Sequence, residues 1–439
     1  MTRRLSRRRL LAALGTVAVA GCAGEDRFWD DPPAFDATNV GTVTDDPVPA
    51  VDSPLPVTVG DRFIANARAA ANSLLETVPD PLTADILPNG VIRQRIQRDR
   101  QAAESALTSL RSATAPLNVI DAAAAARGHA AGAAAAWATV SANRAVTDLP
   151  VSQTELRTRV RNLRQTIPDV APTPAEGAVV YGGLEALLWR ATEDTLRESA
   201  GLQTPLTAAD TATAVNTARA SVAGAEHLYD RYLASLDGAS RVWDELLTAL
   251  DSLGPVVRER SDRLRPDDPS RLLFSGPNVE ALVDRDIPPD HPGERLITSG
   301  FHDSFERLDH VAWPGGATEY SALSVRDTHQ ALAVLATASA LIERLDDGEA
   351  FFPSGASALR TARGSALDAT RALARADSPL STWAGRELAR GISAIDRDLR
   401  RRDVDAKTAA RVYGQYVWLA AVASRIPAAT EKVESAFRG

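Results

Sequence analysis

Apolar residues recur every three to four positions through most of this chain, which is the period of one face of an α-helix. Ile92, Ile96, Ala103, Leu107 and Leu110 mark such a face in one stretch. Strict alternation of apolar and polar residues, the pattern of a half-buried strand, is nearly absent. The sequence therefore predicts an all-α protein. The predicted helices cover residues 61–78, 91–112, 117–144, 153–166, 174–200, 208–235, 239–264, 318–345, 355–376, 379–401 and 404–436.

Prolines and glycines interrupt the helical pattern between residues 265 and 317. We place the domain boundary inside this segment. Short connections between the remaining helices favour antiparallel neighbours. We therefore expect two antiparallel helical bundles, at 60–264 and 318–439, joined by an irregular Pro/Gly-rich segment at 265–317. Because long irregular loops often carry function, this segment is also the predicted recognition element.

Residues 23–59 show neither helical nor strand periodicity. They hold eight acidic residues against one arginine, together with six prolines and scattered single apolar residues. Proline and like charges both extend a chain, at about 3.1 Å per residue. Residues 22–59 are therefore predicted to be a disordered acidic tether, which could reach roughly 110 Å when fully stretched.

The first 21 residues have the layout of a removable export signal, with five arginines followed by an apolar stretch that is too short to span a bilayer. Residues 6–11, with Arg7 and Arg8, resemble the twin-arginine export motif, and residues 19–22 resemble a lipobox ending at Cys22, the only cysteine. This resemblance implies export of an already folded chain and a lipid on Cys22. The expected location is the outer, extracellular face of the cytoplasmic membrane. The alternative is an ordinary secretory signal in which Cys22 is incidental.

The composition changes when the signal is removed. The mature chain keeps 49 − 5 = 44 basic residues against 57 acidic residues, a net charge of −13, and its only lysines are Lys407 and Lys432. An acid excess with little lysine is typical of halophilic proteins and favours a salt-loving archaeal source. A GC-rich genome is the alternative, although it explains the acid excess less well. With no basic domain, a nucleic-acid partner is not expected.

Several linear catalytic signatures are absent from the sequence: Gly-x-Ser-x-Gly, His-Glu-x-x-His, a phosphate loop with its lysine, and Gly-x-Gly-x-x-Gly. The sequence therefore favours a non-enzymatic surface protein that binds a small ligand or a surface protein, without a cofactor. A hydrolase assembled across helices would leave no linear signature. It would need a pocket that holds a carboxylate of perturbed pKa.

The alternative function is metal handling by the polar face of a short predicted helix. His302, Glu306, Asp309 and His310 fall within an arc of about 100° when placed on one helix. Imidazole and carboxylate together suit a divalent metal such as zinc, iron or nickel. The same residues are also compatible with a solvated helix face. His329, in a later helix, is predicted to be a hydrogen-bonded histidine at the edge of the core.

Residues 180–189 resemble the conserved helix of imelysin-like proteins, which are exported two-bundle helical proteins associated with iron handling. Glu185 and Trp189 match the family's pattern of Gly-x-His-x-x-Glu, an apolar run and Trp, but Gly182 occupies the histidine position. The resemblance thus implies metal handling with an incomplete metal pair. The same residues are also compatible with an ordinary buried helix whose core stripe includes Leu184 and Leu187.

Overall fold

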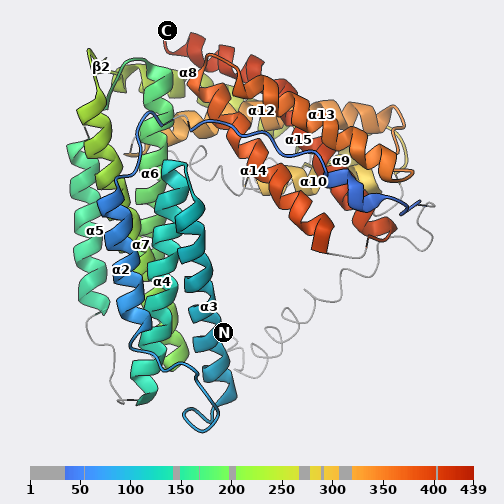
Figure 1. The fold of residues 1–439 in the computed structure, drawn as a ribbon. Helices are drawn as coiled ribbons and strands as arrows, with labels where there is room; N and C mark the ends of the chain where they lie inside the picture. The colour runs from blue at the N-terminus through green and yellow to red at the C-terminus, as the bar shows by residue number, and fades with distance from the viewer. Residues whose placement is uncertain are drawn as a thin grey trace, which may run out of the picture.

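The computed structural model describes residues 35–53, 55–141, 149–167, 169–196, 204–265, 277–287, 291–305, 319–401 and 404–439. These residues form two helical bundles, which confirms the predicted all-α fold (Figure 1). The strands within the described residues are β1 (Val170–Ala171) and β2 (Ser240–Arg241), which pair antiparallel. The two bundles lie at a large angle to each other, so that the molecule resembles an L (Figure 1).

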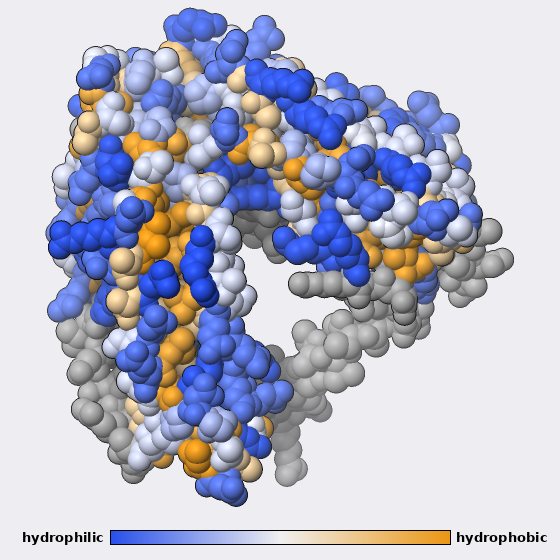
Figure 2. All heavy atoms as spheres, viewed as in Figure 1, coloured by the Kyte–Doolittle hydropathy of each residue, from blue (hydrophilic) through white to orange (hydrophobic). Residues whose placement is uncertain are grey.

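The N-terminal bundle is built around α4, an alanine-rich helix that is apolar on nearly all sides. It packs against α2, α3 and α7. Figure 2 shows apolar surface running along this bundle between more polar flanks. The helices of the N-terminal bundle are α2 (Asp61–Leu75), α3 (Gly90–Ser112), α4 (Pro116–Ser141), α5 (Leu149–Thr166), α6 (Pro174–Leu196) and α7 (Pro205–Ser235).

Polar side chains fix where several helices begin. Asn89 accepts hydrogen bonds from the backbone N–H groups of the first turn of α3. Thr204 forms a capping box with Thr207 at the start of α7. Such caps satisfy amides that have no partner inside the helix. They fix where α3 and α7 begin.

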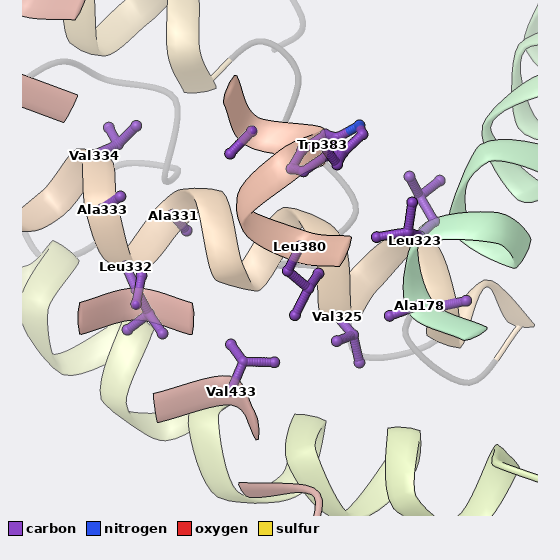
Figure 3. Packing of buried hydrophobic residues seen from close by; sticks show 14 of the residues in the cluster. Ala178, Leu323, Val325, Ala331, Leu332, Ala333, Val334, Leu380, Trp383 and Val433 are labelled. Carbon is purple, nitrogen blue, oxygen red and sulfur yellow. The ribbon is translucent and has the colours of Figure 1, made fainter. Parts of the chain in front are cut away.

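The C-terminal bundle is organised around α12, which packs against α8, α10 and α15. Figure 3 shows Val325 of α12, Leu380 of α14 and Val433 of α15 in one apolar layer. The helices of the C-terminal bundle are α8 (Trp243–Arg263), α9 (Val279–Leu282), α10 (Pro292–Phe305), α12 (Ser321–Asp346), α13 (Ala356–Ala374), α14 (Pro379–Arg401) and α15 (Ala406–Ala436).

The boundary between the bundles differs from the predicted one. We expected residues 239–264 to belong to the first bundle, but α8 packs mainly against α12 and also contacts α15. Helical periodicity shows that a stripe will be buried without showing which neighbour will bury it. The predicted irregular segment 265–317 also contains α9 and α10. Pro292 does not break α10, because proline is tolerated at the first position of a helix.

The predicted disordered tether is also partly wrong, because its second half is packed on the protein. We call residues 35–60 the strap. In Figure 1 the strap runs from the C-terminal bundle across to the start of α2. Its short 3₁₀ helix η1 (Val40–Thr44) packs against α13 and α14 and buries Val40 and Val43. Isolated apolar residues such as Val40 and Val43 therefore hold the strap against the C-terminal bundle.

Hydrogen bonds hold the strap to both bundles. On the C-terminal bundle, Arg363 Nη2 donates to the carbonyl of Asp46 at 2.6 Å. On the N-terminal bundle, the backbone N–H of Gly60 donates to His227 Nε2 at 3.0 Å. Between these points Leu55 is buried in the core that the two bundles share. The strap therefore ties the two bundles together.

Candidate functional site

A cleft of about 570 Å³ lies in the C-terminal bundle between α10, α14 and α15. Its walls are mostly apolar, and α12 contributes Gln330. The apolar walls include Trp383, Leu388, Trp418, Leu419, Val422 and Ile426. The cleft is therefore bounded by regular helices, which hold its shape.

The wall between α10 and α15 depends on a glycine. A Cβ atom built on Gly300 would overlap the ring of Trp418, so only glycine lets α10 lie this close to α15. The indole Nε1 of Trp418 donates a hydrogen bond to Ser304 Oγ at 3.3 Å. Trp418 thus has a satisfied polar atom and presents apolar surface to the cleft.

The other tryptophan of the cleft, Trp383, is held by α12. The guanidinium carbon of Arg326 lies 4.8 Å from the ring centroid of Trp383, a cation–π distance. His329 lies beside the same ring, and its Nε2 hydrogen-bonds Thr430 Oγ1 at 2.8 Å. Complete burial lowers the pKa of His329 to about 4, so this imidazole is neutral near pH 7. His329 is thus a hydrogen-bonded histidine of the protein interior.

The polar residues of the cleft lie among these apolar walls. Arg295 comes from α10, Glu387 from α14, and Arg411 and Gln415 from α15. Small-molecule sites commonly combine apolar walls with a few polar groups that orient the ligand. The arrangement is suited to holding an apolar body and one polar group.

The predicted metal site is only partly within the described residues. His302 lies on α10 with its side chain exposed, while its neighbour Phe301 is fully buried. Glu306, Asp309 and His310 lie outside the described residues, so the four-residue metal site stays a prediction. The described part of the chain holds no group of three or more His, Cys, Asp or Glu residues that could bind a metal.

The segment that resembles imelysins lies in α6, where the two bundles meet. Glu185 is fully buried there, and its Oε2 accepts a hydrogen bond from the backbone N–H of Leu323 at 2.7 Å. A Cβ atom on Gly182 would lie 3.1 Å from the carbonyl oxygen of Ala322. The first turn of α12 therefore fills the space beside the position where the imelysin pattern has histidine.

One arginine lies next to the Glu185 carboxyl group. Arg164 Nη2 lies 3.1 Å from Glu185 Oε1, and Arg164 also lies 3.7 Å from Asp169. Burial raises the pKa of Glu185 to about 8, against the opposing effects of Arg164 and the Leu323 N–H. Glu185 does not line the cleft. A carboxylate of raised pKa is thus present, but outside the pocket that a hydrolase would require.

Sequence reasoning did not identify the residues of the cleft. The rarity of aromatic residues, which make up only 5% of this chain, is the one sequence feature that could have pointed to Trp383 and Trp418. No sequence feature pointed to Arg411, because arginine is common throughout the sequence. The predicted lipid acceptor Cys22 and the export residues Arg7 and Arg8 lie outside the described residues.

None of the described helices is long and apolar enough to cross a membrane.

Comparison with curated proteins and with solved structures found no match. Residues 62–238 match the family described as Domain of unknown function (DUF8262). Residues 243–435 match the family described as Domain of unknown function (DUF8264). The two matches meet between α7 and α8, so the chain is similar to one family in its N-terminal bundle and to another in its C-terminal bundle, α8 included.

Proposed function

We propose that this chain is a lipid-anchored protein of the outer face of the cytoplasmic membrane that binds a small, largely apolar molecule in the cleft between α10, α14 and α15. The observation that carries the proposal is the cleft itself. Its volume of about 570 Å³ falls in the range of roughly 300–1,000 Å³ that is common for small-molecule sites. Two tryptophans supply large apolar contact surfaces in its walls.

The position of α10 supports this proposal. This helix lies within residues 265–317, the segment that the sequence favours as the recognition element, and it forms one wall of the cleft. The other walls belong to the long helices α14 and α15. A site built on regular helices is largely formed before the ligand arrives, which lowers the entropic cost of binding.

The anchor is supported by the signal residues and by the position of the strap. The strap begins at Phe35, which packs against the C-terminal bundle. Thirteen residue steps separate Cys22 from Phe35, a reach of at most about 45 Å. A lipid on Cys22 would therefore hold the Phe35 end of the strap, which packs on the C-terminal bundle, within this distance of the membrane.

Filling the cleft tests the binding function. Ala394 lines the cleft and is exposed, so Ala394→Phe should add bulk to the cleft without crowding the core. We expect the uncharged probe N-phenyl-1-naphthylamine to bind the parent chain saturably, with a rise in fluorescence. Its affinity should fall at least tenfold in Ala394→Phe.

The matched control is Ala428→Phe, on an exposed position of α15 that does not line the cleft. Its affinity for the probe should equal that of the parent. Absence of saturable binding to the parent, or equal affinities in the parent and Ala394→Phe, would contradict binding in this cleft.

A further inference from the structure

We infer that the ligand of the cleft is a long-chain acid whose apolar chain lies along α15 and whose acidic group is bound by Arg411. This inference deepens the proposed function and rests on it. It is carried by three features of the described residues: the length of the cleft, the distribution of charge along it, and a partly exposed guanidinium that the protein pairs only weakly.

The cleft is elongated. Its lining residues on α15 run from Ala410 and Arg411 to Ile426. Fifteen residues of α-helix between Arg411 and Ile426 rise about 22 Å. On α14 the lining runs from Trp383 to Ile395, which is twelve residues or about 18 Å. A volume of about 570 Å³ spread over this length suits an extended chain better than a compact ring system.

The charged residues of the cleft are separated along its length. Arg411 lies at one end, and Arg295 lines the same end because its neighbour Leu296 contacts Gly414. Glu387 lines the cleft one turn from Trp383, near the opposite end, and accepts a hydrogen bond from Arg390 at 2.6 Å. A ligand with one negative group would therefore be oriented with that group toward Arg411.

Arg411 is only partly satisfied by the protein. Its Nη1 donates to Gln415 Oε1 at 3.3 Å and lies 3.5 Å from Asp398 Oδ2. The Asp398 side chain is 43% exposed, so this ion pair is weak. Arg411 Nη2 is buried and has no hydrogen-bond partner among the residues that the structure describes. Nη2 has no exposed surface, so a ligand in the cleft would meet the exposed part of the Arg411 side chain, which is 34% exposed.

The chemistry of arginine favours an acid over a neutral polar group. A guanidinium presents its N–H groups in a planar fork that matches the two oxygens of a carboxylate. Next to Arg411 the cleft continues as mainly apolar surface, from Leu419 and Val422 to Ile426. One acidic group at one end and an apolar body along the rest is the chemistry of a long-chain carboxylate.

A matched pair of fluorescent probes tests this assignment. We would titrate the full chain, carrying Cys22→Ser so that no detergent is needed, with 11-(dansylamino)undecanoic acid and separately with its methyl ester. The two probes share the apolar body and differ in charge. We expect the acid to bind at least tenfold more tightly than the ester.

Two variants of Arg411 test whether this residue causes the preference for the acid over the ester. Arg411→Gln should bring the affinities for acid and ester to within about threefold of each other, and Arg411→Lys should retain part of the preference because it keeps the charge. Arg371→Gln is the matched control, because Arg371 lies outside the cleft and is similarly exposed, at 39% against 34% for Arg411. It should keep the full preference for the acid.

The outcomes separate this inference from the proposed function. If acid and ester bind the parent equally well, the acid assignment is overturned while binding in the cleft stands. If the acid is preferred but the preference survives in Arg411→Gln, the role of Arg411 is overturned. If neither probe binds the parent, both the acid assignment and the proposed function fail.

Discussion

Glu185 shows how a single buried carboxylate joins the two bundles. It lies on α6, and its two oxygens contact the first turn of α12 and the guanidinium of Arg164 on α5. The carboxyl group accepts a hydrogen bond from a backbone N–H at the start of α12, one of the amides that have no partner inside that helix. Arg164 also donates to the carbonyl of Glu319, just before α12. Residues from three helices thus meet at one buried carboxyl group.

The pH dependence of stability should report on this carboxyl group. The pKa of Glu185 is about 8 in the folded chain, above the ordinary value of 4.5. A group whose pKa is raised on folding binds its proton more tightly in the folded state. Its stabilising contribution is therefore present in full below pH 4.5 and is lost as the pH rises through 8. We expect Glu185 to lower the free energy of unfolding by up to about 1.4 kcal/mol per pH unit within this window.

Denaturant unfolding at pH 5, 6.5 and 8 would measure this effect. Glu185→Gln keeps an acceptor for the Leu323 N–H but cannot titrate, so its stability should fall less steeply with pH than that of the parent. Glu259→Gln is the control, because Glu259 is exposed on α8. Equal slopes in the parent and Glu185→Gln would show that this carboxyl does not titrate in the window.

Single residues of the candidate site were only partly predictable. His329 was predicted to be a hydrogen-bonded histidine at the edge of the core; it is hydrogen-bonded, but it lies fully buried and not at the edge. The sequence could not predict that Arg411 Nη2 lacks a hydrogen-bond partner. The partners of an arginine depend on side chains that only tertiary packing brings near it. Its neighbour Asp398 lies on the preceding helix.

At the scale of elements, hydrophobic periodicity predicted the long helices well. A side-chain cap marks the start of some of these helices, such as Asn89 at α3 and Thr204 at α7. The sequence predicted a short helix that includes His302 but not the start of α10 at Pro292, because prolines and glycines interrupt the helical pattern there. Short elements of this kind depend on neighbours for their stability, because helix nucleation is unfavourable.

The strap gives a prediction at this scale. Val43 is 1% exposed in η1, although the surrounding sequence is acidic and rich in proline. Val43→Asp would bury a carboxylate among the apolar side chains of α13 and α14. We expect it to lower the free energy of unfolding by about 2 kcal/mol. Protease cleavage within residues 35–60 should become faster, because the strap loses its anchor.

Val91→Asp is the matched control for the strap variant. It makes the same change at a residue of α3 that is 67% exposed. Limited proteolysis and denaturant unfolding of this control should resemble those of the parent. Unchanged cleavage of the strap in Val43→Asp would mean that η1 does not hold it in place.

At the scale of the whole molecule, one core joins the two bundles. Leu184 of α6, Leu246 of α8 and Leu332 of α12 belong to the same cluster of buried apolar residues. The strap crosses this junction on its way between the bundles (Figure 1). The angle between the bundles is therefore held by a shared core and by a covering segment.

The anchor is tested on the whole chain in its native cells. We expect the parent to partition into the detergent phase of a Triton X-114 extract and Cys22→Ser to move to the aqueous phase, because the lipid is its proposed anchor. Arg7→Lys combined with Arg8→Lys keeps the charge but alters the twin-arginine pair, so this variant should remain in the cytosol. Detergent-phase partitioning of Cys22→Ser would rule out Cys22 as the lipid site.

The sequence by itself determined the helical class, the positions of the long helices and the division into two bundles. These follow from local periodicity and from the positions of prolines and glycines, which act within a few turns of one helix. Only the tertiary structure decided that α8 joins the C-terminal bundle, that residues 35–60 are packed, and that Trp383, Trp418 and Arg411 share a cleft. These features depend on contacts between residues far apart in the chain, which hydrophobic periodicity does not specify.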